Sequence, residues 1–307
     1  MKSVLSASRR TDIPAFYMDW FMHGVEAGCF EVANPYNGQT FLVPAGPQDV
    51  HSIVFWSKNF ETFNLGDYGP YLESRGYHLW FNFTLNSESE LLEPNLPPLA
   101  ERLTQLEQLC RRHDPHAVQW RFDPICFYRD GAGRFQDNLK DFSQIANVAA
   151  DLGVTRCVTS FMDMYSKITK RLAGRADIVF IDSVPASKIE VLMDMTAILE
   201  PLGISLQTCC EGSLLEKIGN DPAVEPSACI PNDRIMALYG GRISLARDRG
   251  QRIKNGCGCM KSTDIGSYKQ QPCYHNCLYC YANPTEGGHY PGEPARSQKV
   301  HFKAEAF

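Results

Sequence analysis

The sequence predicts an α/β fold, in which a full or partial (β/α) barrel of the TIM type is followed by a cysteine-rich, cluster-binding C-terminal segment. Short runs rich in β-branched and aromatic residues alternate with helical patterns along the first two thirds of the chain. Strands in such an alternation lie parallel and are joined by right-handed crossovers. Seven of the twelve cysteines fall between Cys210 and Cys280, and this concentration sets the C-terminal segment apart from the body.

The elements of the body follow from residue type and periodicity. The predicted strands are residues 3–7, 52–57, 77–84, 117–122, 155–161, 177–181 and 204–209. The predicted helices are residues 14–27, 96–112, 135–152, 163–173 and 185–200. The helix at 135–152 has the clearest apolar face, from Phe135 to Leu152, with Gly153 placed to end it. This number of strand and helix units favours a full or partial barrel over an open sheet.

The cysteines suggest where the chain divides. We predict a barrel body over residues 1–212 and a cysteine-rich iron-sulfur segment over residues 213–307 that packs on it. The remaining cysteines lie singly in apolar stretches, where a thiol behaves as a small hydrophobe. These predicted core residues are Cys29, Cys110, Cys126, Cys157 and Cys209.

Composition and charge narrow the class of protein. The chain has 307 residues, of which 44% are hydrophobic and 21% charged, which excludes disordered, collagen-like and coiled-coil proteins. The N-terminus has no signal-peptide pattern, and no apolar run reaches the roughly 18 residues that cross a bilayer. We therefore expect a cytoplasmic protein with no membrane partner. Disulfides are rare in the cytosol, so clustered cysteines there indicate metal binding or catalysis.

Polar residues follow several predicted strands, at the end where barrel enzymes carry their chemistry. Charged groups beside apolar strands need a partner or a ligand when they are buried. We predict catalytic roles for Arg9, Arg121 and Asp123, and cofactor contacts for Ser8, Arg10 and Gln207. The alternative is that these residues belong to ordinary polar loops and helix caps.

The strongest motif is CYHNCLYC, with cysteines at Cys273, Cys277 and Cys280. Three thiolates at this spacing can hold three irons of a 4Fe-4S cluster and leave the fourth iron open. An open iron can chelate the amino and carboxylate groups of S-adenosylmethionine (SAM), whose reductive cleavage yields a 5'-deoxyadenosyl radical. Tyr279 is expected to pack beside this cofactor. A zinc site completed by His275 or His289 is the alternative.

The CxxxCxxC pattern, with an aromatic residue before its last cysteine, resembles the signature of the radical SAM superfamily. The whole chain also resembles a bacterial family of uncharacterised proteins whose C-terminal cysteines are similar to that cluster loop. The residues that carry this resemblance are SASRRTDIPAF at 6–16, FWSKN at 55–59, RFDPI at 121–125, CGCMKSTDIGSY at 257–268 and CYHNCLYCYAN at 273–283.

The resemblance implies an enzyme that cleaves SAM reductively, supplied by an electron donor such as flavodoxin or ferredoxin, and acts on a substrate that the sequence does not identify. In typical radical SAM enzymes the cluster loop follows the first barrel strand, whereas here it follows the last predicted one. The resemblance therefore implies a permuted or convergent arrangement.

Four further cysteines, Cys210, Cys229, Cys257 and Cys259, make a complete ligand set. We predict an auxiliary 4Fe-4S cluster there, with a structural zinc or no metal as alternatives. Cys209 can replace Cys210 as a ligand, because adjacent residues of a strand point to opposite faces.

A basic run lies near these cysteines, with six positive side chains and one negative between Arg242 and Lys261. It is compatible with nucleic-acid phosphates, with the SAM carboxylate, or with the charge of thiolate-bound clusters. The net charge of −5 does not favour nucleic acid as a partner. Two rival functions stay open: an iron-sulfur electron-transfer or redox-sensing protein without SAM chemistry, and a zinc-stabilised nucleic-acid-binding module.

Overall fold

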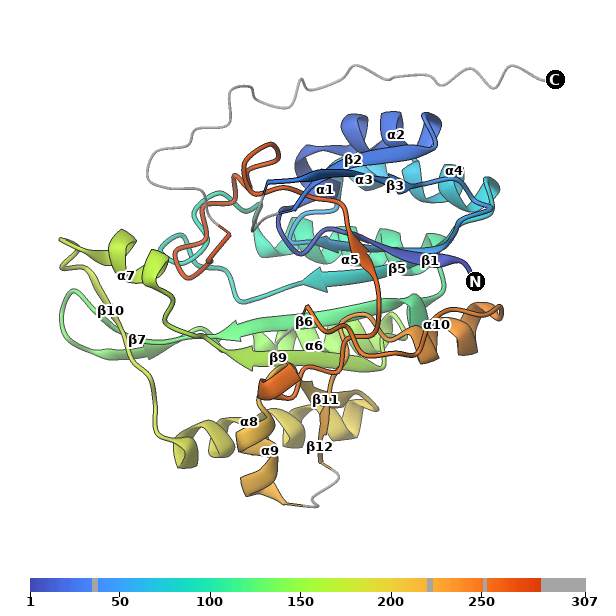
Figure 1. Cartoon of the computed structure of the whole chain (residues 1–307). Helices are drawn as coiled ribbons and strands as arrows, with labels where there is room; N and C mark the ends of the chain where they lie inside the picture. The colour runs from blue at the N-terminus through green and yellow to red at the C-terminus, as the bar shows by residue number, and fades with distance from the viewer. Residues whose placement is uncertain (35–37, 220–222, 251–252, 283–307) are drawn as a thin grey trace.

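A parallel sheet of eight strands forms the centre of the computed structural model, which describes residues 1–34, 38–219, 223–250 and 253–282. The strand order is β12-β11-β9-β6-β5-β4-β1-β13, and every neighbouring pair is parallel (Figure 1). The strands are β1 (Ser3–Ala7), β4 (Val50–Ser57), β5 (His78–Thr84), β6 (Val118–Ile125), β9 (Arg156–Phe161), β11 (Ser205–Thr208), β12 (Val224–Pro226) and β13 (Thr263–Asp264). The predicted α/β class is confirmed.

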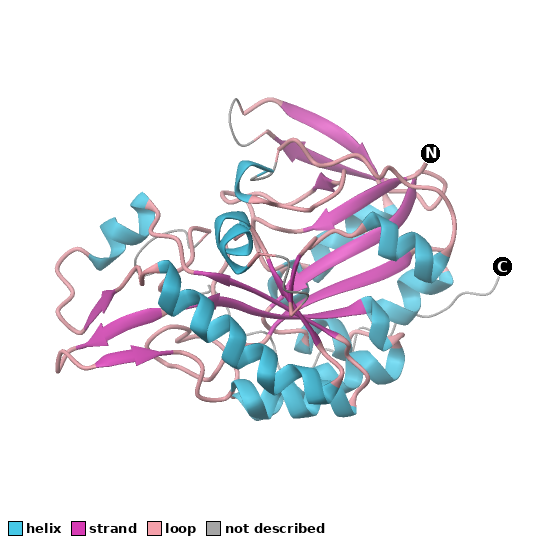
Figure 2. Ribbon diagram, turned by 90° about the horizontal axis from the view of Figure 1, so that it is seen from below, coloured by secondary structure: helices cyan, strands magenta, loops and turns pink. Residues whose placement is uncertain are grey.

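Helices cover one face of this sheet. Side chains alternate between the two faces of a strand, and one set, which includes Leu5, Phe55 and Phe81, packs on helical residues such as Phe21 and Leu106. The helices of this layer are α1 (Ile13–Phe16), α2 (Met18–Glu26), α3 (Glu61–Leu65), α4 (Tyr68–Ser74), α5 (Leu99–Arg112), α6 (Phe142–Asp151), α8 (Pro185–Leu199) and α9 (Gly212–Ile218). Figure 2 shows most of the helices along one side of the strands.

The C-terminal segment covers the opposite face. Val54 and Trp80 point to this side and pack on Ile230 and on Ile235 of helix α10 (Asn232–Tyr239). Farther along the same face, Val158 packs on a second group of side chains, which consists mainly of cysteines. The cysteine-rich part of the chain is thus buried against the strands.

The same segment supplies both edges of the sheet. Strand β12 pairs with β11 at one edge, and β13 pairs with β1 at the other, where Leu5 is opposite Thr263. In Figure 1 this C-terminal strand lies beside the blue N-terminal one. Within the described residues the two edges do not pair with each other, so the strands form no closed barrel.

Two small antiparallel sheets complete the fold: β2 (Cys29–Ala33) with β3 (Thr40–Pro44), and β10 (Ile178–Phe180) with β7 (Phe127–Asp130) and β8 (Phe135–Asp137). The strand predicted at 177–181 exists as β10, outside the main sheet. The helix predicted at 135–152 begins only at Phe142, because residues 127–137 form a hairpin.

The turn of that hairpin explains the difference. The Asp130 carboxylate accepts hydrogen bonds from the backbone N–H groups of Ala132 and Arg134, and Gly133 takes a positive φ of 77°. Helix α7 (Ser166–Leu172) lies near the predicted 163–173. No helix among the described residues is long and apolar enough to span a membrane.

Candidate functional site

The first residues after β1 attach the C-terminal segment to the sheet. The carboxylate of Asp264, at the end of β13, accepts hydrogen bonds from Ser8 Oγ at 2.6 Å and from the Arg9 backbone N–H at 2.7 Å. Arg10 donates to the Gly266 carbonyl at 2.9 Å. A Cβ at position 266 would lie 2.2 Å from Ser8 Oγ, so this close approach requires glycine. Ser8 and Arg10, predicted to bind cofactor, here hold the chain leading to the CYHNCLYC motif.

Asp12 attaches the motif itself, residues 273–280, which we call the cysteine loop. Its buried carboxylate accepts from His275 Nε2 at 2.7 Å, from Ser57 Oγ at 2.7 Å and from the Lys58 backbone N–H at 2.9 Å. His275 Nδ1 is buried and has no hydrogen-bond partner among the described residues. A histidine that donates one ring N–H to a carboxylate leaves its other nitrogen as an acceptor, as in the second shell of many metal sites.

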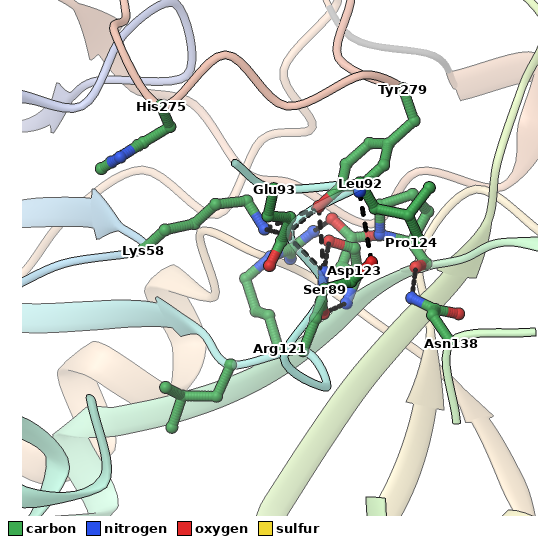
Figure 3. Close-up of polar contacts among 12 residues, drawn as sticks. Lys58, Ser89, Leu92, Glu93, Arg121, Asp123, Pro124, Asn138, His275 and Tyr279 are labelled. Atoms are coloured by element: carbon green, nitrogen blue, oxygen red, sulfur yellow. Dashed lines mark hydrogen bonds and ion pairs between the residues drawn. The ribbon is translucent and has the colours of Figure 1, made fainter. Parts of the chain in front are cut away.

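A buried polar group lies under the other end of the cysteine loop (Figure 3). Lys58 Nζ donates to Glu93 Oε1 at 2.7 Å and to the Tyr279 hydroxyl at 2.9 Å. The Tyr279 hydroxyl donates to the same Glu93 oxygen. Asn86 Nδ2 donates to both the hydroxyl and Glu93, and Arg102 Nη1 lies 4.0 Å from Glu93 Oε2.

The charges of this group follow from its environment. Burial alone raises the pKa of Glu93, but Lys58 and Arg102 outweigh it and hold that pKa below the ordinary value. Burial likewise lowers the pKa of Lys58, and Glu93 outweighs it and raises that pKa. Burial, followed by the charge of Glu93, raises the pKa of Tyr279 well above its ordinary value. The group is therefore an ion pair with a neutral phenol as hydrogen-bond donor.

The three thiols of the cysteine loop are close enough to influence one another. Burial raises the pKa of Cys273 and of Cys277, the Asp12 carboxylate raises the first further and the Glu93 carboxylate the second, and a neighbouring thiolate at Cys280 adds to both. Lys58 opposes the increase at Cys277. Arg171 binds the carbonyls of Leu278 and Cys280 at 2.6 and 3.0 Å. Three neighbouring thiolates in this setting would repel one another unless a metal cation lay between them.

A second group consists of five free thiols, Cys209, Cys210, Cys229, Cys257 and Cys259, and we call it the five-cysteine cluster. The Sγ atoms of Cys209 and Cys210 are 3.6 Å apart, and those of Cys209 and Cys229 are also 3.6 Å apart. Cys259 is hydrogen-bonded to Cys229 and Cys257, and Cys257 also to Cys210.

Cys209 belongs to this cluster, although its apolar neighbours in the sequence predict that it is an ordinary residue of the hydrophobic core. Strand β11 ends at Thr208, and Cys210 adopts a left-handed backbone with φ of 66°. The alternation of a strand therefore no longer applies, and both neighbouring side chains reach the cluster. Cys209 was predicted only as a replacement for Cys210, whereas in the structure both lie in the cluster.

Two arginines border the five-cysteine cluster. Arg121 Nη1 lies 2.6 Å from Cys229 Sγ, and its other nitrogen pairs with the Asp123 carboxylate. The guanidinium groups of Arg9 and Arg121 lie 5.5 and 5.4 Å from the ring centroid of Trp56. Burial lowers the pKa of Arg121, but Asp123 and Cys229 outweigh it and raise that pKa well above its ordinary value. Arg121 is thus a fixed cation.

Asp123 connects the two cysteine sites. It accepts from Ser160 Oγ and pairs with Arg121, and the charge of Lys58, which also acts on Cys277, helps lower its pKa. Asn86 completes the connection, because its Nδ2 donates to the Tyr279 hydroxyl at 3.0 Å and to the Asp123 carbonyl at 3.1 Å. Hydrogen bonds and the Asp123–Arg121 ion pair therefore link the cysteine loop to Cys229.

One family covers all of these residues. A family described as a domain of unknown function, DUF1848, matches residues 4–282. The chain belongs to the DUF1848 family. No curated protein and no solved structure matches it.

Most of the predicted site residues of this DUF1848 chain lie together. Arg9, Arg121, Asp123 and Tyr279 all contribute to the contacts above, but Gln207 does not, because its Nε2 donates to Glu225 Oε2 at 3.0 Å at the β12 edge. Of the basic run, Arg247 binds the Cys257 carbonyl at 3.1 Å. Arg252 and His289, the latter an alternative zinc ligand, lie outside the described residues.

Among the site residues that were not singled out from the sequence are Trp56, Glu93 and Asp264. Trp56 and Asp264 lie in the segments FWSKN and CGCMKSTDIGSY that carry the family resemblance, so a signal existed for them. Glu93 lies in a loop with no such signal.

The donor chemistry of both cysteine sites fits iron-sulfur clusters, which thiolates hold. As the side chains lie, no group of three or more His, Cys, Asp or Glu residues in the described part of the chain is arranged to hold a single metal ion. The supporting features are the eight free thiols at the two sites and the cations beside them, Lys58 and Arg121.

Proposed function

We propose that this DUF1848 protein is a radical SAM-type enzyme that binds a 4Fe-4S cluster through Cys273, Cys277 and Cys280. The observation that carries the proposal is the position of the cysteine loop at the carboxyl ends of the parallel strands. The loop contacts Asp12, in the loop between β1 and α1, and Lys58, the residue after β4, both beyond the carboxyl ends of parallel strands. Chemistry in (β/α) barrels occurs at this end of the strands.

The winding of the sheet supports the comparison with a barrel. From β1 through β4, β5, β6, β9, β11 and β12, each strand lies beside its predecessor, and helices cover one face. This order of strands supports the proposal of a partial (β/α) barrel. The cysteine loop reaches the carboxyl ends from the C-terminus, consistent with the permuted arrangement that the sequence resemblance implies.

In this proposal, different residues bind the cluster and balance its charge. The three thiolates would hold three irons, and the fourth iron would supply SAM binding and one-electron cleavage. Lys58 offsets negative charge at Cys277. Arg9, fixed on Trp56, would offer a cationic group to a carboxylate, and Arg121, paired with Asp123 and Cys229, would supply positive charge beside the five-cysteine cluster. An external donor such as flavodoxin or ferredoxin would provide the electron.

The five-cysteine cluster would bind the auxiliary iron-sulfur cluster. A closed 4Fe-4S cluster needs four cysteines, and five are in mutual contact. Arg121 contacts Cys229 and pairs with Asp123, whose carbonyl accepts a hydrogen bond from Asn86 beside Tyr279. The auxiliary cluster would therefore lie next to the Asp123–Arg121 ion pair.

The rival from another class is an iron-sulfur electron-transfer or redox-sensing protein. This rival function is favoured by the closeness of the two cysteine sites, which Asp123 and Arg121 connect, because electron-transfer proteins also place their clusters close together. Addition of SAM separates the two functions: an enzyme of the proposed type shows a changed cluster spectrum and releases 5'-deoxyadenosine after reduction, and a relay shows neither. A zinc-stabilised nucleic-acid-binding module would contain zinc in place of iron.

The metal content of anaerobically purified protein tests both cysteine sites at once. We expect a brown protein with more than about four irons and matching sulfide per chain, because the two sites together exceed the ligand needs of one cluster. Iron, sulfide and zinc are measured on the same sample. The Cys29→Ser variant is the control. It alters a half-buried thiol of β2, in the separate β2–β3 sheet, and should keep the full iron and sulfide content. Stoichiometric zinc with negligible iron would contradict the proposal.

The two adjacent cysteines give a second, finer test. We expect Cys209→Ser and Cys210→Ser each to retain most of the second cluster, because either thiol can take the place of the other. The double variant should lose that cluster, about half of the total iron by the stoichiometry of two 4Fe-4S clusters. Cys257→Ser should lose it as a single change. Equal iron in the double variant and the wild type would exclude both residues as ligands.

A further inference from the structure

We propose that a pocket at the amino-terminal end of the strands, opposite the cysteine sites, binds a phosphate group. Its lining consists of Trp80, His116, Arg156, Arg234, Ala237 and Leu238, around a volume of about 260 Å³. Arg156 is the first residue of β9, and Arg234 belongs to α10. The pocket shares no residue with the candidate functional site, and the proposal does not depend on SAM chemistry.

Two buried N–H groups of this pocket have no acceptor. Trp80 Nε1 and Arg156 Nε are both inaccessible to solvent and lack a hydrogen-bond partner among the described residues. Trp80 is 1% exposed and Arg156 9%. A buried donor without an acceptor costs about 1–3 kcal/mol, so such groups are rare unless a ligand or a water satisfies them.

The Arg156 side chain is held in a fixed position. Its Nη2 donates to the His116 carbonyl at 2.6 Å, and its guanidinium stacks over the Trp80 ring at 5.1 Å from the centroid. The guanidinium is therefore preorganised, and a ligand that binds it need not order a flexible side chain.

The charge around Arg156 is unbalanced. Burial and then the like charge of Arg234 lower its pKa to about 10, and the nearby carboxylate of Asp233 only partly opposes this. Neither arginine forms an ion pair within the described part of the chain. An oxyanion between the two guanidinium groups would remove the repulsion.

The geometry favours one phosphate group over larger ligands. Guanidinium groups bind phosphate through paired N–H donors. Pockets for drug-sized ligands have roughly 300–1,000 Å³, so about 260 Å³ holds a phosphate with a small substituent and not a whole nucleotide. Because Arg156 already covers one face of Trp80, that face is not free to stack with a base.

Calorimetric titration of the full chain with inorganic phosphate tests the site. We expect saturable binding, and in Arg234→Gln an affinity at least about tenfold weaker, as expected for the loss of one charged hydrogen bond. Arg234 is half-buried at the rim, so this change should not prevent folding. The charge-matched control is Arg134→Gln, which alters an exposed residue of the β7–β8 hairpin and should bind phosphate as the wild type does.

A second variant tests the anion site independently, and a set of ligands tests its preference for phosphate. In Arg234→Glu a carboxylate takes the place of the anion beside Arg156, so phosphate should no longer raise the melting temperature. Glycerol phosphate is compared with inorganic phosphate to distinguish a phosphomonoester from the free ion, and acetate tests carboxylates. Equal phosphate affinity in Arg234→Gln and the wild type, or acetate binding as tight as phosphate, would overturn the proposal.

Discussion

Replacement of Cys277 by serine should abolish reductive SAM cleavage, and not merely slow it. If three cysteines hold three irons, the fourth iron is open to SAM only while all three ligands are present. Cys277 is the most buried of the three thiols and packs against Leu92 and Tyr279, so its loss cannot be repaired by water without exposing that core. The same loss is expected for Cys273→Ser and Cys280→Ser. The measurement is 5'-deoxyadenosine released by anaerobically reconstituted, dithionite-reduced protein.

Two matched variants show whether the effect belongs to the cysteine loop. Cys257→Ser removes a thiol of the five-cysteine cluster and should leave residual SAM cleavage, because the first site keeps its ligands. Cys29→Ser should have wild-type activity. If the wild type with a full complement of iron neither changes its spectrum on SAM addition nor releases 5'-deoxyadenosine, the enzyme proposal fails and the electron-transfer function replaces it.

The parallel sheet was predictable because its strands are buried on both faces. Strands such as β5 and β9 are covered by helices on one side and by the C-terminal segment on the other, and their sequences HLWFNFT and RCVTSF are rich in the β-branched and aromatic residues that strands favour. Their positions were predicted to within a few residues. The edge strands β12 and β13 have three and two residues, too few for any periodicity to be recognised.

The site was predictable in part for a different reason. Cysteine spacing and the position of charges after strands are local signals, and they led to Cys273, Cys277 and Cys280 and to Arg9, Arg121 and Asp123. Glu93 could not be found in this way, because its role depends on Lys58 and Tyr279, which are 35 and 186 residues away in the chain. Gln207 was included because it is a polar residue near the end of a predicted strand, and in the structure it donates to Glu225 at the sheet edge.

Glu93→Gln should lower the free energy of unfolding by about 3–5 kcal/mol, the typical cost when one partner of a buried ion pair is removed. Glu93 and Arg102 are both almost inaccessible to solvent, and Lys58 is 16% exposed. The substitution therefore leaves two cations without their common counter-charge. Urea unfolding of the apoprotein, followed by circular dichroism, measures the change without interference from bound metal.

The double variant Glu93→Gln, Lys58→Met distinguishes ionic destabilisation from disturbed packing. Removal of both charges should recover part of the lost stability, because the uncompensated ammonium group is gone. The surface control is Arg111→Ala, which breaks the exposed pair with Glu107 and should cost less than about 1 kcal/mol. A Glu93→Gln variant as stable as this control would show that the polar group under Tyr279 is not an ion pair. In that case the cysteine loop would depend on Asp12 and His275 for its anchorage, and Lys58 would be free to compensate the negative charge of Cys277 alone.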